Sequence, residues 1–290
     1  MAPPFAHYRE FAPSDTLRDS VRAFFSFGAP APAAPRRPPL LEVRFRSGDP
    51  FCSPVFADGH ISLVFSFSRV LRRDGLWRTT ALRPQTEIIG PMTRVGPAAS
   101  AERREMMGAY LRPGVSESLT AAPAGLLSDR VETLEALWGS AATRLLDQLA
   151  ETEGEVARLD LLESALVARL SAPRPAAPWN LPDLAAHIRR RRGCVSVADM
   201  AADAGISRQH LARAFRLHIG VSPKTYCCLA RFQAALQFAG RAPSLNWAQA
   251  AVDLGYSDQS HLIAEFRRFS SLTPQQIVHQ RCFHPFIVRR

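Results

Sequence analysis

Two short stretches near the C-terminus carry polar side chains that can hydrogen-bond to the edges of nucleic-acid bases. The first contains Arg208, Gln209 and Arg213, and the second contains Gln259 and Ser260. A guanidinium can bond the O6 and N7 atoms of guanine together, and a glutamine amide can pair with adenine in the same way. Such chemistry requires a rigid element, for instance a helix that fits the major groove, to present these side chains.

The two stretches belong to an internal repeat, in which Ala-Ala-Asp-Ala-Gly-Ile-Ser is followed later by Ala-Val-Asp-Leu-Gly-Tyr-Ser. Gly205 and Gly255 are 50 positions apart, whereas Phe215 and Phe266 are 51 apart, so one residue has been inserted within the second copy. A repeat this close predicts two copies of one structural unit.

Each copy has the pattern of two helices joined by a tight turn. Gly205 and Gly255 supply the left-handed conformation that lets a helix end and the chain reverse. We expect Ser207 and Ser257 to cap the helices that follow, because their hydroxyl oxygens can accept from unpaired backbone N–H groups. Apolar residues one turn apart predict a buried face on each second helix. These residues are Leu211, Phe215, Leu262 and Phe266.

The positive charge of the chain is concentrated in the part that contains the repeat. Residues 171–290 carry 15 arginines and one lysine against six acidic residues, a net charge of +10, whereas residues 1–170 carry 20 charges of each sign. A structural domain that only faces water has no need of this segregation. The distribution therefore predicts a surface that binds phosphate groups.

Further matching residues follow the two turns and complete a family pattern. They are Ser207, Leu211, Arg213, Phe215 and Gly220–Pro223 in the first copy, and Gly255–Ser260, Phe266 and Thr273–Pro274 in the second. With these residues, the stretch from Val195 to Gln276 resembles the paired helix-turn-helix domain of the AraC/XylS transcription regulators. Two positions depart from the pattern: Ala264 stands where the family usually has arginine, and Ser271 where it usually has glycine. These departures predict a weaker grip by the second reading helix.

The resemblance implies an all-α domain of seven helices in which a long helix joins two recognition helices. Periodic apolar residues independently predict a helix over 223–239, which begins at Pro223 and ends before Gly240. A rigid connector would let the two recognition helices enter successive major grooves, about 34 Å apart, without a dimer. Such a domain would read an asymmetric site.

The exposed positions of the two recognition helices divide into expected base contacts and expected phosphate contacts. For each arginine among them, the alternative is a side chain that only meets water. The base-reading candidates are Arg208, Gln209, Arg213, Gln259, Ser260 and Ile263, the last through a thymine methyl group. The phosphate candidates are Ser207, Arg216, Ser257, Arg267 and Arg268.

The N-terminal part reads as short β-strands separated by turns such as Asp58-Gly59, which predicts a small barrel or sandwich. It weakly resembles the sensor-like domain of some AraC/XylS regulators, which implies a cupin-like effector or dimerisation domain. The predicted fold class is therefore α+β, with a β-rich domain, a helical flank and an all-α double helix-turn-helix domain. The expected divisions are 1–140, the β-rich domain; 141–170, a helical linker or dimerisation segment; 171–180, a proline-rich hinge; and 181–290, the DNA-binding domain.

The residue types needed for catalysis are not found in useful patterns. His7 and His60 are the only histidines of the N-terminal half, and the five cysteines form no Cys-x-x-Cys pair. No nucleophile elbow or phosphate-binding glycine loop is present in the sequence. We therefore predict no enzymatic activity, no metal and no cofactor.

Residues 1–10 lack the features of a signal peptide, and no apolar run approaches the roughly 20 residues that cross a bilayer. These observations, with the DNA-binding pattern, predict a cytoplasmic bacterial protein with no membrane partner. The expected function is sequence-specific transcription regulation, with activation favoured by the family resemblance. The expected partners are promoter DNA, RNA polymerase, a small-molecule effector and a second copy. The alternative is a ligand-binding or partner-binding protein that its basic domain tethers to DNA without sequence preference.

Overall fold

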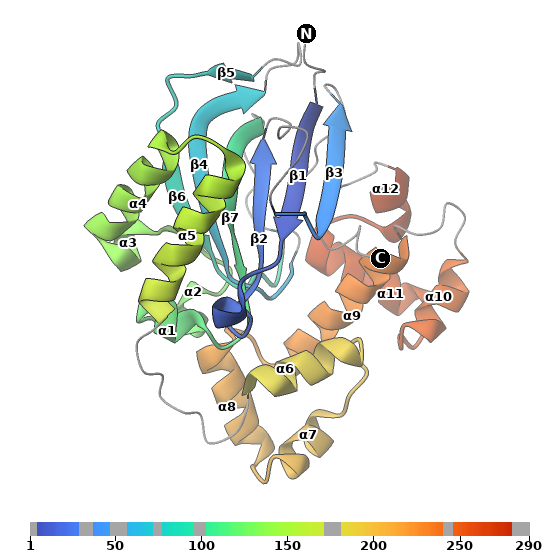
Figure 1. Ribbon diagram of the computed structural model, residues 1–290. Coiled ribbons are helices and arrows are strands. Elements are labelled where there is room, and N and C mark those ends of the chain that lie inside the picture. The colour runs from blue at the N-terminus through green and yellow to red at the C-terminus, as the bar shows by residue number, and fades with distance from the viewer. Residues whose placement is uncertain are drawn as a thin grey trace.

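The protein is described from a computed structural model that covers residues 5–28, 37–46, 57–71, 77–95, 103–170, 181–239 and 246–279. An antiparallel sheet with flanking helices is followed by a wholly helical region (Figure 1). The predicted α+β class, with a β-rich domain before an all-α domain, is confirmed. The expected hinge at 171–180 lies outside the described residues.

The N-terminal domain is built on one eight-stranded sheet with the order β3-β1-β2-β7-β4-β6-β8, in which β5 pairs with β4. All its ladders are antiparallel, and among the described strands β3 and β8 are the two ends of this order. The strands are β1 (Phe5–Phe11), β2 (Val21–Gly28), β3 (Leu41–Arg46), β4 (Ser62–Leu71), β5 (Trp77–Thr79), β6 (Gln85–Ile89), β7 (Arg103–Leu111) and β8 (Val131–Thr133).

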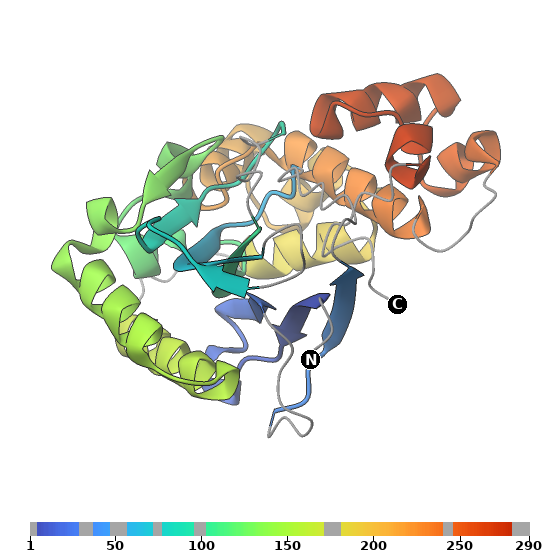
Figure 2. The same cartoon turned by 90° about the horizontal axis from the view of Figure 1, so that it is seen from above.

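Both faces of the sheet carry buried residues. Alternate residues of a strand point to opposite sides, so neighbouring residues belong to different cores. Phe24 of β2 and Phe65 of β4 belong to a large core shared with the flanking helices. Phe25 and Val64, their chain neighbours, belong to a smaller core on the other face. Figure 2 shows α4 and α5 on one side of the curved sheet and the C-terminal helices on the other.

Among the described residues, five α-helices complete the N-terminal domain, and the last two span the segment 141–170, for which helix was expected. Gly154, with a φ of +92°, separates α4 from α5. The leucines of both helices are buried in the core that also contains the sheet. The apolar faces of these two helices therefore pack on their own domain. The helices are α1 (Ser116–Thr120), α2 (Ala124–Leu127), α3 (Glu135–Trp138), α4 (Ser140–Glu151) and α5 (Glu155–Leu170); a short 3-10 helix, η1, spans Asp15–Leu17.

The described C-terminal residues form seven helices around a separate core, as the family resemblance implied. The predicted connector is present as α9, with the expected limits Pro223 and Ala239. The helices are α6 (Leu181–Arg190), α7 (Val197–Asp203), α8 (Arg208–His218), α9 (Pro223–Ala239), α10 (Trp247–Asp253), α11 (Gln259–Ser270) and α12 (Pro274–His279).

Strand β7 contains a charged run around Arg104 and Glu105, which is more typical of a solvated strand edge or loop. It is instead a central strand, paired with β2 and β4. Arg104 is buried, where it donates hydrogen bonds to the Phe67 and Arg83 carbonyls and to Gln85. The charged side chain of Arg104 can be buried because backbone carbonyls and a side-chain oxygen accept hydrogen bonds from its guanidinium.

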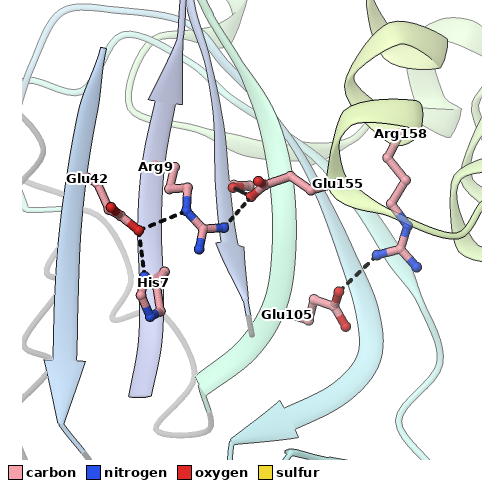
Figure 3. A network of polar contacts seen from close by, with 7 residues as sticks. His7, Arg9, Glu42, Glu105, Glu155 and Arg158 are labelled. Atoms are coloured by element: carbon pink, nitrogen blue, oxygen red, sulfur yellow. Dashed lines mark hydrogen bonds and ion pairs between the residues drawn. The ribbon is translucent and has the colours of Figure 1, made fainter. Parts of the chain in front are cut away.

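Ion pairs attach α5 to the outer strands β1 and β3 and to the central strand β7 (Figure 3). Arg9 of β1 donates to Glu42 of β3 at 3.1 Å and to Glu155 of α5 at 2.8 Å. The His7 ring contacts Glu42 at 2.7 Å, and Arg158 donates to Glu105 at 2.9 Å. The hydrogen bond to His7 and the contact with Arg9 hold the pKa of Glu42 below its usual range.

We expect Glu42→Gln to lower the stability of the N-terminal domain at pH 7 by about 1 kcal/mol, the upper end for pairs that water reaches. Because the pKa of Glu42 is lower in the folded protein, its contribution is present above the ordinary pKa and is lost as the pH falls through the folded value. Urea denaturation of both proteins between pH 7 and pH 3.5 measures this difference. It should shrink on acidification, and Glu153→Gln, at an exposed carboxylate between α4 and α5, is the control.

Candidate nucleic-acid interface

The first helix-turn-helix consists of α7 and α8 and has the predicted turn. Gly205 adopts a φ of +65°, and the Ile206 N–H donates to the Ala201 carbonyl at 2.9 Å, which closes the end of α7. Ser207 caps α8 as expected, since its hydroxyl oxygen accepts from the His210 N–H at 3.1 Å. Leu211 and Phe215 are fully buried. Thus the polar side of α8 is turned outward.

The second helix-turn-helix consists of α10 and α11, and its cap differs from the prediction. Asp258, not Ser257, is the N-cap: its carboxylate accepts from the His261 N–H at 2.8 Å. The Ser257 hydroxyl donates to Asp258 at 3.1 Å and so supports the cap from outside the helix. The aspartate is the stronger acceptor for a helix start, since its charge also favours the positive end of the helix dipole.

This cap also locates the inserted residue. The N-cap follows Gly205 by two positions but Gly255 by three, so the extra residue lies in the second turn. The two reading helices then align at an offset of 51, which pairs Arg213 with Ala264. Both positions are exposed. The second helix therefore presents a methyl group where the first presents a guanidinium.

The base-reading candidates are placed largely as the sequence suggested. Arg208, Gln209 and Arg213 are exposed on α8, and Gln259 and Ser260 are exposed at the start of α11. Ile263 differs, because its side chain is half-buried and packs against the C-terminal core. Less of the Ile263 side chain is therefore available for contact with a base than at the exposed positions of the two helices.

The phosphate candidates lie at the two ends of the reading helices. Ser207 and Ser257 are exposed in the turns before α8 and α11. Arg216, Arg267 and Arg268 are exposed in the last turns. These arginines flank the outward surfaces of their helices.

Ser271 ends α11 in the left-handed conformation, with a φ of +58°. A side chain is strained there, whereas glycine is not. This explains physically why glycine suits the position. The backbone strain caused by serine at this position therefore lies at the C-terminal end of α11, away from the exposed N-terminal turn that carries Gln259 and Ser260.

Helix α9 holds both reading units through aromatic contacts. Tyr226 packs against Phe215 of α8 with ring centroids 6.0 Å apart. Six residues further along, Phe232 packs against Phe266 of α11 at 5.0 Å and against Phe269 at 5.3 Å. Removing an aromatic side chain from such a site costs about 3–5 kcal/mol, so packing fixes the separation of the two reading helices.

Polar contacts reinforce the attachment of the second unit to α9. Arg231 donates to the Gly255 carbonyl at 2.7 Å, within the turn before α11. Its Nε also lies 3.9 Å from the carboxylate of Glu265, which is buried on the inner side of α11. One side chain of the connector is thus hydrogen-bonded to the turn and lies within ion-pair distance of the reading helix.

A loop of the N-terminal domain, residues 57–60, inserts into the C-terminal domain; we call it the docking loop. Ala57 is buried in the C-terminal core, and its N–H donates to the Phe269 carbonyl at 3.2 Å. Gln233 of α9 donates to the Asp58 carbonyl at 2.7 Å. The turn predicted at Asp58-Gly59 is therefore also a contact between the domains.

His60 completes the docking loop, and its contacts define its tautomer. Arg189 of α6 lies 3.0 Å from Nε2 of His60, and Nδ1 lies 2.7 Å from the Asp58 carbonyl. Because a guanidinium can only donate, Nε2 must accept and Nδ1 must carry the proton. His60 is therefore neutral in this contact.

A second contact joins the N-terminal domain to the end of the first reading helix. The Ser128 hydroxyl donates to the Gly220 carbonyl at 2.5 Å, and His218 of α8 lies 3.4 Å from Glu117 of α1. A Cβ on Gly125 of α2 would stand 2.6 Å from the Arg216 carbonyl. The helices α2 and α8 thus pack backbone to backbone.

The contacts of the docking loop with the C-terminal domain were not predicted from the sequence. His60 was considered only as a metal ligand, and Gln233 and Arg189 were not singled out. Among the described residues, no group of three His, Cys, Asp or Glu side chains is arranged to hold a metal ion. No helix in the described ranges is both long enough and apolar enough to cross a membrane.

The fold and the exposed faces of α8 and α11 define a two-domain protein with a double helix-turn-helix. Residues 200–280 match the family described as "Helix-turn-helix domain", and the C-terminal domain is of the AraC type. It is the DNA-binding domain of a transcription regulator. Residues 9–133 match a second family, described as "Domain of unknown function (DUF6597)". No curated protein matches this chain.

Similar solved structures include three of ToxT from Vibrio cholerae. Apo ToxT of strain SCE256, in a variant form, has a TM-score of 0.43 at 9% identity, covering 97% of this chain and 99% of that chain. ToxT of strain O395 has a TM-score of 0.42 at 9% identity, covering 96% and 98%. Wild-type ToxT of strain SCE256 bound to an unsaturated fatty acid has a TM-score of 0.41 at 10% identity, covering 95% of each chain.

The docking loop should respond to pH through Asp58, whose pKa burial raises to about 7. The contribution of a group whose folded pKa is raised is full below its ordinary pKa and is lost as the pH rises through the folded value. We therefore expect the loop to open more readily as the pH rises from about 4 to about 7, by up to about 1.4 kcal/mol per pH unit, and to show no further dependence above that range.

Amide hydrogen exchange of the docking loop in the full chain, between pH 5 and pH 8 and corrected for intrinsic rates, measures this effect. Asp58→Asn should remove the dependence, because asparagine keeps an oxygen for the His60 N–H but does not ionise. Asp203→Asn, at an exposed position in α7, is the matched control. Equal pH dependence in wild type and Asp58→Asn would contradict the assignment.

Proposed function

We propose that this protein is a sequence-specific transcription regulator that reads an asymmetric DNA site with α8 and α11. The observation that carries the proposal is the pair of exposed polar helix faces held at a fixed separation by α9. This helix has 17 residues and is therefore about 26 Å long, so it spans most of the roughly 34 Å repeat of the major groove. One chain can thus present both helices to one face of a duplex.

Within this proposal, α8 is the stronger reader. Arg213 would contact guanine, while Arg208 and Gln209 would contact neighbouring bases or a phosphate. On α11, Gln259 and Ser260 would read, and the methyl group of Ala264 would contribute no hydrogen bond. Arg216, Arg267 and Arg268, with the turn residues Ser207 and Ser257, would position the helices on phosphates.

The N-terminal domain, in this proposal, senses a small molecule or pairs two subunits and transmits the result through the docking loop. The loop contacts α6, α9 and the end of α11, so a change in the N-terminal domain would bear on both reading units. Activation through RNA polymerase is the expected outcome, in a protein without enzymatic activity. Binding to chromosomal DNA would place it in the bacterial cytoplasm.

Selection of the purified full chain on a random duplex library at physiological salt tests the function. We expect one asymmetric motif that spans two major grooves and binds at least about a thousandfold tighter than scrambled DNA. Binding with no enriched motif and a steep salt dependence would instead indicate a protein held on DNA by charge alone. That outcome would reject sequence-specific regulation in favour of a non-specific tether.

Two arginine substitutions distinguish reading from positioning on the selected site. Arg213→Ala should cost about 1–3 kcal/mol at its cognate base pair and relax specificity there, whereas Arg267→Ala should weaken binding to all sequences alike. Affinities for the selected duplex and for duplexes with single base changes measure both effects. Arg191→Ala, at an exposed arginine outside the two reading helices, is the control. Uniform loss with Arg213→Ala would remove it from the readers.

A further inference from the structure

A cavity of about 1200 Å³ lies between the two domains, and both contribute to its walls. Arg22 and Arg112 line it from the sheet domain, while Arg189 and Arg190 line it from α6. Residues from β3 and α9 complete the enclosure. This volume is above the range of about 300–1,000 Å³ typical of sites for organic ligands, so the cavity has room for an organic molecule and is far larger than a single ion requires.

The charged side chains of the cavity are mainly positive. Glu42 already contacts His7 and Arg9, and Glu10 accepts from the Tyr8 hydroxyl at 2.9 Å and lies 3.7 Å from Arg22. Both carboxylates are therefore engaged within the sheet domain. The charged lining residues are Arg22, Arg112, Arg189, Arg190 and Arg192, against Glu10 and Glu42.

Two of these arginines repel each other across the domain boundary. Burial, and then the nearby charge of Arg189, hold the pKa of Arg112 below its ordinary value. Arg189 itself contacts a neutral acceptor, Nε2 of His60, which leaves its positive charge uncompensated at that contact. An anion between Arg112 and Arg189 would replace this repulsion by two charge-assisted hydrogen bonds.

The uncharged part of the wall contains Gln233 and Gln237 but is otherwise largely apolar, which favours a ligand with a carbon skeleton. Leu40 and Leu41 face the cavity from the start of β3, and Ala230, Ala234 and Phe238 face it from α9. An inorganic anion would leave this surface in contact with water. A larger organic molecule would cover it, and each Å² of apolar surface removed from water favours binding.

We propose that this cavity binds an organic molecule with at least two acidic groups, carboxylates or phosphates, which bridges the two domains. Two acidic groups are needed because the arginines are contributed by both walls and exceed the two carboxylates by three. The inference deepens the proposed function, since it assigns the chemical class of the effector. A bound bridge would hold the sheet domain against α6 and α9, and so against the helix that spaces the readers.

Isothermal titration calorimetry of the full chain without DNA tests the proposal. The probes are dicarboxylates of four to twelve carbons and sugar bisphosphates, compared with octanoate and inorganic phosphate. We expect at least one dianionic organic probe to bind at one per chain, and at least tenfold more tightly than octanoate or phosphate. No binding across the panel would overturn the proposal. Equal binding of octanoate would overturn the need for two acidic groups, and equal binding of phosphate the role of the apolar wall.

Substitutions then locate the bound probe. Arg112→Gln and Arg190→Gln should each weaken it at least tenfold, whereas Arg191→Gln should change its affinity less than twofold. Arg191 is the matched control, because it is an exposed neighbour of Arg190 that does not line the cavity. Arg189 is not substituted, because it also donates a hydrogen bond to His60 of the docking loop. Equal effects of Arg190→Gln and Arg191→Gln would place the probe elsewhere. The titrations contain no DNA, so a negative result would reject the proposed ligand without bearing on the proposed DNA recognition. A negative DNA selection would likewise leave the ligand proposal standing.

Discussion

The architecture of the C-terminal domain depends on the burial of α9. Aromatic residues on this helix contact the first reading unit through Tyr226 and the second through Phe232, and both side chains are essentially inaccessible to solvent. Close packing makes such contacts costly to change, so the spacing between the readers is set inside the protein rather than by a flexible linker. The same helix also receives the docking loop through Gln233. One buried element therefore relates the two readers to each other and to the N-terminal domain.

Several of the described contacts between the domains are polar and specific in geometry. His60 must be neutral to accept a hydrogen bond from Arg189. Burial raises the pKa of Asp58 to about 7, and the Ser128 hydroxyl donates to the Gly220 carbonyl in the turn after α8. Such an interface can be biased by a modest free energy, because a ligand shifts a two-state equilibrium only by its differential affinity for the two states. The arginine-lined cavity beside this interface is placed where a bound molecule would have that effect.

Local patterns explain why much of the reading domain could be predicted. Gly205 and Gly255 determine the turns, Leu211 and Phe215 determine the buried face of α8, and the proline at 223 marks the start of α9. Prediction failed where alternatives differ by a long-range contact or by competition between neighbours. Asp258 replaces Ser257 as the cap because the inserted residue moves the start of α11, and Arg104 enters a central strand because β2 and β4 supply partners on both sides.

The sequence by itself determined the two reading units, the connector between them, the helical flank broken at Gly154 and the segregation of positive charge, because each depends on residue types at short spacing. Only the tertiary structure decided what the docking loop touches, which arginines line a common cavity and how β7 is enclosed. Those relations join residues more than a hundred positions apart, such as His60 and Arg189. They follow from how the two cores pack against each other, and no local spacing encodes that packing.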